Sequence, residues 1–207
     1  MLILALDTSG SVASCALLRD GVVLEQAVQQ SRMDHSRLLL PLCRELLARH
    51  GLEPKQMDAF AAVIGPGSFT GIRIGTAAVK GFAWALEKPC AGISSLEAMA
   101  FDWEGEGTVC CSLRARPGER YFALFRREGG AVTRLTPDAV GTDGQVEAAL
   151  AQYAPAAHLQ DCQRASGAVK AAWARAQAGE LQGCHEILPA YLRLSQAERM
   201  RKERMES

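Results

Sequence analysis

The sequence predicts an α/β protein with a mixed β-sheet covered by helices, followed by a smaller second lobe. Three apolar stretches joined by tight turns open the chain, which indicates an antiparallel meander. Helical and strand-like stretches then alternate, as they do where helices cover the faces of a sheet. A stretch rich in glycine and acidic residues at 102–107 marks a boundary, so we expect lobes at residues 1–102 and 103–207.

The opening meander consists of strands predicted at residues 2–6, 11–18 and 22–28. Asp20 and Gly21 separate the second and third stretches, and this residue pair is typical of hairpin turns. A helix, a strand, a helix, a strand and a short helix follow before the boundary. This order is the ribonuclease H-like arrangement, in which helices lie on the faces of a mixed sheet.

A leucine-rich helix is predicted over residues 34–50, with Asp34 as its N-cap. Apolar side chains cover more than half of its circumference, whereas a helix that lies on a sheet needs only a narrower stripe. Pro41 removes one helical hydrogen bond and bends the helix. We therefore expect the excess apolar surface to be covered by the helix of residues 70–86 or by another polypeptide.

A turn of two glycines and a proline, residues 65–67, connects an apolar strand at 59–64 to a helix predicted over 70–86. Ser68 or Thr70 is expected to cap this helix. One side of the helix carries mostly small residues, namely Gly71, Gly75, Ala78, Phe82 and Ala85. Glycines on that side let the helix axis lie close to a strand.

The opposite side of the same helix carries Arg73, Ala77, Lys80 and Trp84. A large aromatic residue beside a small alanine on a polar side is typical of a surface that binds another protein. The alternative is a surface tryptophan that lies over the aliphatic stems of its neighbours. The spacing alone fits both interpretations.

The second half of the chain is too small to mirror the first in full. Its predicted elements are strands at 109–113, 120–127 and 131–135 and helices at 142–153 and 165–178. The last residues, 192–207, mix arginine, lysine and glutamate with few apolar side chains. That composition is typical of a solvated helix or a disordered end.

Asp7, Thr8 and Ser9 end the first predicted strand and resemble the first phosphate loop of the actin, hexokinase and Hsp70 superfamily. In that superfamily the aspartate positions a hydrated divalent cation, and backbone N–H groups of the turn face phosphate. The alternative is that Asp7 and Ser9 satisfy the amides of their own turn. Because a short Asp-Thr-Ser string is common, we favour the alternative and regard the turn as a vestigial phosphate loop at most.

Other chemistry has little support in the sequence. No histidine or cysteine pair has the spacing of a zinc site, and the GxSxG string of many serine hydrolases is absent. His35 could be a metal ligand, but a hydrogen-bonding role at a helix start is the more common use. Five arginines surround two predicted strands, where they either contact RNA phosphate or line a solvated sheet edge. They are Arg114, Arg116, Arg120, Arg126 and Arg127.

Net charge, cysteine placement and the length of apolar runs indicate which classes of protein this chain fits. The formal net charge is zero, so electrostatic attraction of nucleic acid by this chain alone is expected to be weak. Seven cysteines form no CxxC pair, and several lie in apolar runs, as is typical of buried free thiols in a reducing compartment. No apolar run approaches the length of a membrane span. We expect a soluble cytoplasmic protein that does not bind membranes.

Several stretches together resemble the TsaB family, also called YeaZ. They are residues 3–9, His35 with Ser36 and the Leu-Leu-Pro that follows, 65–75, 92–97 and 189–193. The string Gly-Pro-Gly-Ser-Phe-Thr-Gly-Ile-Arg-Ile-Gly at 65–75 is highly specific. The chain departs from the family at Arg114, where an aspartate is usual, and at Arg120, where the family has an apolar residue. Any role of that aspartate is therefore not carried over to this chain.

The resemblance implies a two-lobed actin-like fold, also similar to Hsp70, with a reduced second lobe. It implies a non-catalytic subunit of the machinery that installs threonylcarbamoyl on the adenosine next to the anticodon of tRNA. In that family TsaB binds TsaD, the related subunit that holds the metal and performs the transfer. TsaE, an ATPase, joins the pair, and TsaC makes threonylcarbamoyl-adenylate. ATP and a metal are therefore expected in the partner subunits, and tRNA is expected to bind only through the complex.

The resemblance also implies a partner interface made by the two N-terminal helices, residues 35–49 and 70–86 in this sequence. In the family these helices pack on their counterparts in TsaD, or on a second TsaB in a homodimer when TsaD is absent. The interface residues carried over are His35, Leu39, Cys43, Leu46, Leu47, Thr70, Arg73, Ala77, Lys80 and Trp84.

Two other functions remain as alternatives to this scaffold. The first is an enzyme, either a small ATPase or kinase that uses Asp7 or a glycoprotease-like hydrolase of the same superfamily. The second is a direct tRNA binder that uses the arginine cluster. Binding of ATP by the isolated chain would favour the enzyme, and binding of tRNA by the isolated chain would favour the tRNA binder.

Overall fold

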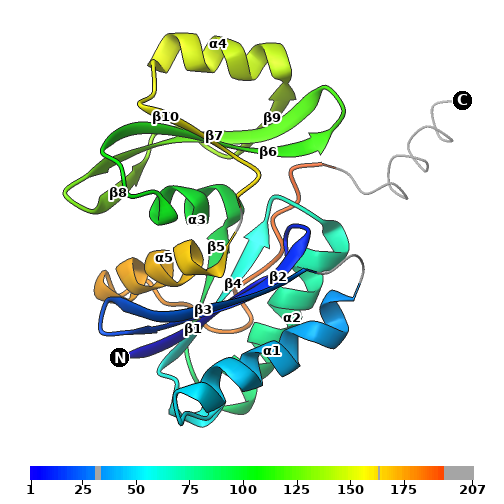
Figure 1. The fold of residues 1–207 in the computed structure, drawn as a ribbon, viewed down its shortest axis with the longest axis vertical. Helices are drawn as coiled ribbons and strands as arrows, with labels where there is room; N and C mark the ends of the chain where they lie inside the picture. The colour runs from blue at the N-terminus through cyan, green and yellow to red at the C-terminus, as the bar shows by residue number, and fades with distance from the viewer. Residues whose placement is uncertain (31–33, 163, 194–207) are drawn as a thin grey trace, which may run out of the picture.

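The computed structural model describes residues 1–30, 34–162 and 164–193. Two β-sheets form two layers, with helices α3 (Ser95–Asp102) and α5 (Ala165–Gln177) lying between them (Figure 1). The chain thus has the predicted α/β, two-lobed actin-like fold with a mixed sheet and a reduced second lobe.

The first sheet has the strand order β3-β2-β1-β4-β5. Its strands are β1 (Leu2–Asp7), β2 (Val12–Arg19), β3 (Val22–Gln30), β4 (Ala59–Gly65) and β5 (Cys90–Ser94). The first three strands pair antiparallel, whereas β4 is parallel to β1 and β5 is parallel to β4. This pairing confirms the predicted meander and the ribonuclease H-like order.

Helices cover both faces of the first sheet. On one face lie α1 (His35–Arg49) and α2 (Phe69–Ala85), and on the other lies α5. Leu4 of β1 packs with α1 and α2, while its neighbour Ile3 packs with α5, because successive side chains of a strand point to opposite faces. A short 3₁₀ helix, η1 (Pro54–Gln56), leads from α1 into β4.

The second sheet has the order β10-β6-β7-β8, with β9 also paired to β7. Its elements are β6 (Gly107–Arg116), β7 (Glu119–Glu128), β8 (Ala131–Arg134), β9 (Ala139–Thr142), α4 (Asp143–Tyr153) and β10 (Ala157–Gln160). Leu96 and Met99 of α3 are buried against this sheet. The sequence did not predict β9 and β10, since both are short and β10 lacks a run of apolar residues.

Helix α5, from the second half of the chain, packs against the first lobe. Although α5 lies within residues 103–207, its Ala168 and Val169 are buried against the first sheet. Gly167 permits a close approach to α3, because a Cβ there would stand 1.8 Å from the carbonyl oxygen of Ala98. The second half of the chain therefore contributes to both lobes.

The segment after α5, residues 180–193, returns along the first lobe, and we call it the C-terminal strap. Gln182 and Cys90 exchange two backbone hydrogen bonds of 2.7 and 2.8 Å. Further along, the backbone N–H of Ala190 donates to the carbonyl of Ile64 at 2.8 Å. The strap therefore lies beside β5 and β4 and is fixed to both by backbone bonds.

Three expectations from composition concern the chain as a whole. All seven cysteines are free, and five of them are buried, as their places in apolar runs predict. Within the described ranges no helix is long and apolar enough to cross a membrane. The predicted solvated or disordered end, residues 192–207, falls outside the described residues after Arg193.

The start of α2 lies against the turn that follows β1. The Thr8 hydroxyl donates to the carbonyl of Gly71 at 2.6 Å. A Cβ at Gly71 would stand 1.9 Å from the Thr8 carbonyl oxygen, and a Cβ at Gly67 would stand 2.4 Å from that of Ser9. Ser68 caps the helix by accepting from the N–H of Gly71. The predicted close approach is confirmed, and glycine is required because the backbones touch.

We predict that Gly71→Ala destabilises the fold by about 1–3 kcal/mol or more, because the added methyl forces α2 away from Thr8. Gly81→Ala is the matched control on the same helix, since a Cβ there meets nothing within 4 Å. That change should stabilise the helix by about 0.5–1 kcal/mol. Thermal melts measure both, and equal melting temperatures for the two variants would contradict the proposed contact.

Candidate functional site

A groove of about 790 Å³ runs between α1 and α2 on the face of the first lobe that is turned away from the second (Figure 1). Its lining is mainly apolar or small, and includes Leu40, Cys43, Leu47 and Ala48 of α1 and Ala77, Ala78, Gly81 and Phe82 of α2. Small residues on α2 keep the surface hollow between the two helices. An apolar groove of this kind accepts an amphipathic helix of another chain.

Large apolar side chains of α1 and α2 are exposed: Leu40 lines the groove, and Trp84 follows the groove residue Gly81 by about one helical turn. Trp84 of α2 is 72 % exposed and Leu40 of α1 is 50 % exposed. Ala77 is also exposed on α2, on the side where the residue spacing predicted it, and Thr70 is exposed near the start of the helix. An apolar groove with exposed large side chains at its edge is typical of protein-binding surfaces. Sequence reasoning missed Leu40 as a site residue, although it belongs to the wide apolar arc of α1.

Four of the interface residues expected on α1 are largely buried within the chain. Leu39, Cys43, Leu46 and Leu47 are at most 2 % exposed and belong to the core between α1 and the first sheet. A hydrogen bond with Cys15 and burial raise the pKa of the Cys43 thiol, which stays neutral. The chain itself therefore covers most of the apolar arc of α1. Only the edges of Cys43 and Leu47 contribute to the groove.

Two cations of α2 also have partners within the chain. Arg73 donates from Nε to the Tyr191 hydroxyl at 2.7 Å. Lys80 donates from Nζ to the carbonyl of Ile187 at 3.2 Å. Both partners belong to the C-terminal strap, so these two residues fix the strap to α2. Their place at a partner interface stays a prediction, and the spacing of α2 could not show that the chain end returns to this helix.

The Asp7 turn is closed by its own residues. Asp7 is 2 % exposed and accepts from the N–H and the hydroxyl of Ser9 at 2.8 and 2.7 Å. Burial raises the pKa of the Asp7 carboxyl, although the bonds from Ser9 and the positive charge of Arg164 oppose this effect. The backbone at Gly71 of α2 lies on Thr8 and that at Gly67, just before the helix, lies on Ser9, with no space for a methyl group at either glycine. The Asp7 carboxylate oxygen that a cation would need is already occupied by Ser9.

Nearby N–H groups are also occupied. At the start of α5, the N–H of Ala165 donates to the Ser14 hydroxyl at 3.1 Å, and that of Ser166 donates to Gln26 at 2.9 Å. A helix start attracts anions through free N–H groups, but here side chains of the first sheet accept hydrogen bonds from two of them.

His35 is half-buried at the start of α1, and among the described residues its Nε2 has no hydrogen-bond partner.

Most of the arginine cluster is neutralised within the chain. Arg116 pairs with Glu119, Arg126 with Glu128, Arg127 donates to the Trp103 carbonyl, and Arg120 donates to Ser112 and Gln160. The Arg114 side chain is exposed. Because partnered guanidinium groups attract phosphate less strongly, the cluster gives little support to direct tRNA binding.

Across the described ranges, no group of three or more metal-binding side chains comes together.

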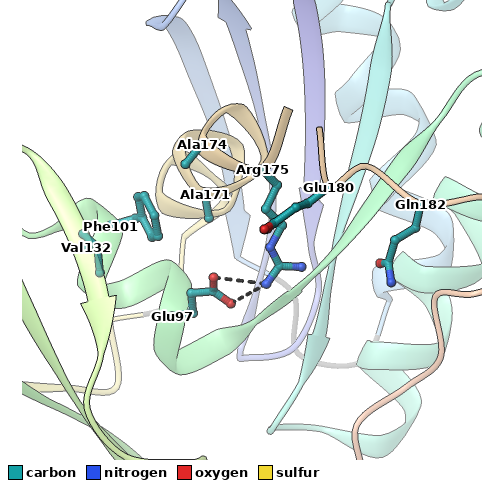
Figure 2. Close-up of a pocket in the computed structure, with 8 residues that line it drawn as sticks. All are labelled: Glu97, Phe101, Val132, Ala171, Ala174, Arg175, Glu180 and Gln182. Carbon is teal, nitrogen blue, oxygen red and sulfur yellow. Dashed lines mark hydrogen bonds and ion pairs between the residues drawn. The ribbon is translucent and has the colours of Figure 1, made fainter. Parts of the chain in front are cut away.

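A second pocket, of about 450 Å³, opens between the lobes beside α3 and α5 (Figure 2). Its lining combines apolar residues with Glu97, Arg175, Glu180 and Gln182. Arg175 donates to both carboxylate oxygens of Glu97, at 2.8 and 3.1 Å, so the charges at the centre of this pocket already satisfy each other.

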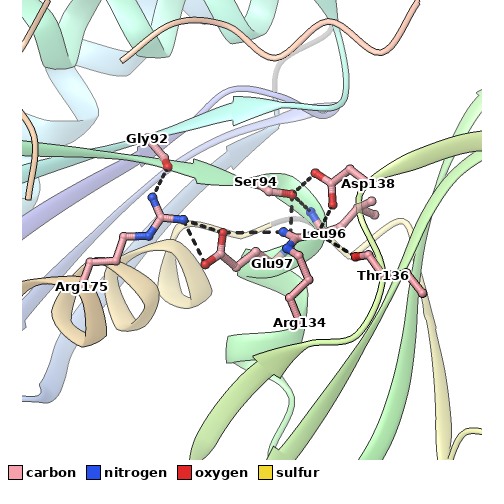
Figure 3. Close-up of polar contacts among 8 residues, drawn as sticks. All are labelled: Gly92, Ser94, Leu96, Glu97, Arg134, Thr136, Asp138 and Arg175. Carbon is pink, nitrogen blue, oxygen red and sulfur yellow. Dashed lines mark hydrogen bonds and ion pairs between the residues drawn. The ribbon is translucent and has the colours of Figure 1, made fainter. Parts of the chain in front are cut away.

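A network of polar contacts around Glu97 joins the two lobes (Figure 3). Arg175 of α5 also donates to the carbonyl of Gly92 at 2.6 Å. From the second lobe, Arg134 lies 3.8 Å from the Glu97 carboxylate and also pairs with Asp138. The hydroxyl of Ser94, which caps α3, donates to Asp138 at 2.5 Å. These contacts tie β5 and α3 to the second sheet and have a structural role.

Among the residues that the structure describes, the apolar groove is open, the Asp7 turn is bonded to its own residues, and the charges of the pocket between the lobes pair with each other. Comparison with known proteins agrees with a family built on this fold. A family model described as TsaD, tRNA N6-adenosine threonylcarbamoyltransferase, matches residues 19–178, well over half of the chain.

Curated relatives carry a related name. The Bacillus subtilis protein "tRNA threonylcarbamoyladenosine biosynthesis protein TsaB" is 33% identical over 139 residues, which are 67% of this chain and 61% of that protein. The Haemophilus influenzae protein of the same name is 39% identical over 131 residues, which are 61% of this chain and 54% of that protein. The chain thus spans somewhat more than half the length of the curated relatives it matches.

A solved structure from Pseudomonas aeruginosa, of a protein described as similar to peptidase YEAZ, superposes with a TM-score of 0.81. It is 28% identical, and the match covers 93% of this chain and 99% of that one. The chain therefore belongs to the tRNA N6-adenosine threonylcarbamoyltransferase (TsaD) family, in the branch of the proteins named TsaB and YeaZ.

Proposed function

We propose that this chain is a non-catalytic subunit in tRNA threonylcarbamoyladenosine biosynthesis and that it binds a TsaD-type transferase subunit through α1 and α2. The apolar groove between these helices, with Trp84 72 % exposed beside it, carries the proposal. Relatives named for this biosynthesis support the process. The family model supports the choice of partner, since related folds present related helices to each other.

The shape of the groove favours a helical partner. Ala77 and Gly81 form a low region of α2, and Trp84 stands beside it as a large projecting side chain. A partner with a similar pair of helices can place its own projecting side chain in the low region and receive Trp84 in return. The same geometry allows a two-fold pairing of two copies of this chain, so we expect a homodimer when the transferase subunit is absent.

The closed Asp7 turn supports a scaffold rather than an enzyme. Thr8, Ser9 and α2 fill the space that phosphate would need, and the nearby helix start is capped by side chains. In this proposal ATP and the metal belong to partner subunits, with TsaE as the ATPase and TsaC as the source of threonylcarbamoyl-adenylate. tRNA is reached through the complex, and the free thiols fit a cytoplasmic location.

The alternative function is a small ATPase or a glycoprotease-like hydrolase. It would require Asp7 to hold a hydrated cation or a reacting group, which a carboxyl that is 2 % exposed does not do in this conformation. A direct tRNA binder would require the arginine cluster to release its carboxylate and carbonyl partners. The scaffold needs no rearrangement of the described residues, which is why we prefer it.

We predict that Ala77→Arg weakens binding of the TsaD-type subunit from the same genome by tenfold or more. The long charged side chain would fill the hollow beside Trp84, and tenfold corresponds to about 1.4 kcal/mol. Ala148→Arg, on the exposed side of α4 in the second lobe, is the matched control. Calorimetric titration measures both variants after thermal melts have shown that they fold, and unchanged affinity for Ala77→Arg would disprove the groove as the interface.

We predict that the isolated chain does not bind ATP with magnesium in calorimetry, because the turn that would hold phosphate is filled. We also predict that Asp7→Asn keeps the fold and the affinity for the transferase subunit. The amide oxygen can still accept from Ser9, and the substitution removes a charge whose burial is unfavourable. Saturable ATP binding that Asp7→Asn abolishes would favour the ATPase instead.

A further inference from the structure

The C-terminal strap has two different sides. Ile187 is 2 % exposed and inserts into the core between α1, α2 and the first sheet. Its neighbour Leu188 is 64 % exposed, and Tyr191 is 40 % exposed. Ile187 thus anchors the strap in the core, whereas Leu188 and Tyr191 are exposed to solvent. A large apolar residue held in the open on an anchored segment is typical of a binding surface.

Contacts with α2 keep the strap in register with that helix. The Tyr191 ring stacks on Phe69, with 4.7 Å between ring centroids, and the Arg73 guanidinium lies 5.5 Å from the centre of the same ring. The hydrogen bond from Arg73 to the Tyr191 hydroxyl and that from Lys80 to the Ile187 carbonyl fix the second half of the strap to α2. The strap therefore lies along one edge of α2, two helical turns in length.

The exposed side of α2 joins the strap to the groove. At about 100° per residue, Arg73, Lys80 and Trp84 share one edge of the helix, and Ala77 and Gly81 share the next. The first edge contacts the strap and the second lines the groove. Helix α2 therefore connects the strap, which Arg73 and Lys80 contact, to the groove, which Ala77 and Gly81 line. Trp84 of the same helix and Leu40 of the groove lining are large exposed apolar residues.

We propose that the C-terminal strap is a third element of the partner-binding surface, with Leu188 as its main apolar contact and Tyr191 as the residue that positions it. The occupant is the TsaD-type subunit proposed above, and the inference rests on that proposed function. This role gives Arg73 and Lys80 an indirect part in the interface.

Leu188→Glu tests the proposal directly. Leu188 and Val22 are both 64 % exposed. Val22 follows the turn between β2 and β3, and a Cβ at its neighbour Gly21 would stand 3.2 Å from Trp173 of α5. Helix α5 lies on the opposite face of the first sheet from α1 and α2. Val22→Glu is therefore the matched control for adding a charge at an exposed apolar site. We expect Leu188→Glu to weaken binding of the TsaD-type subunit at least tenfold and Val22→Glu to change it less than twofold, in titrations of the full chain.

The positioning role of Tyr191 has its own readout. Tyr191→Phe removes the hydroxyl that accepts from Arg73 and keeps the ring that stacks on Phe69. We expect a three- to tenfold loss of affinity with unchanged far-ultraviolet circular dichroism. We expect the loss from Arg73→Gln and Tyr191→Phe together to be smaller than the two separate losses combined, since both changes break the same hydrogen bond, while Arg73→Gln also removes the guanidinium from the ring. Fully additive losses would show that the shared hydrogen bond does not position the strap.

The outcomes separate this inference from the proposed function. If Ala77→Arg abolishes binding while Leu188→Glu binds as well as Val22→Glu, the strap is not part of the interface and the groove still is. If Ala77→Arg and Leu188→Glu both bind normally, the proposed function and this inference are both wrong. If Leu188→Glu weakens only self-association of the chain, the occupant is a second copy and the assignment to the transferase subunit is overturned.

Discussion

The contact between α2 and the turn after β1 is the constraint on which the rest of the structure depends. Gly71 and Gly67 bring the backbone of α2 onto the carbonyls of Thr8 and Ser9, at distances that exclude any side chain. Hydrogen bonds from the Thr8 hydroxyl and to the Ser68 hydroxyl fix the rotation of the helix about its axis. That rotation decides which residues of α2 face the sheet, which face α1 and which face solvent.

The same contact has two consequences, one for the Asp7 turn and one for the outer side of α2. The turn that resembles a phosphate loop is filled by the chain, so Asp7 becomes a buried acceptor for Ser9 rather than a cation site. At the same time Trp84 and Ala77 are held outward beside the groove. The same helix contact thus accounts for both the internal bonding of the Asp7 turn and the outward direction of these two residues.

Particular residues show what the sequence could and could not predict. The strand order and the role of Gly71 were predictable, because hairpin turns and closely spaced glycines have strong local causes. The burial of Leu39 and Leu46 was not, since a wide apolar arc does not reveal how much of it the first sheet covers. The partners of Arg73 and Lys80 were missed because they lie more than one hundred residues away in the sequence. Exposure of Trp84 was predictable from spacing, whereas the strap beside it was not.

The central claim is that the outer face of α2, with the groove beside it, is where the TsaD-type subunit binds. Amide hydrogen exchange of the chain, alone and with that subunit, tests this most directly because it maps protection without any substitution. The account predicts slower exchange in α1, in α2 and in the C-terminal strap, with no change in α4 or β8. Protection confined to the second lobe, or no protection under conditions where the two chains bind, would contradict it.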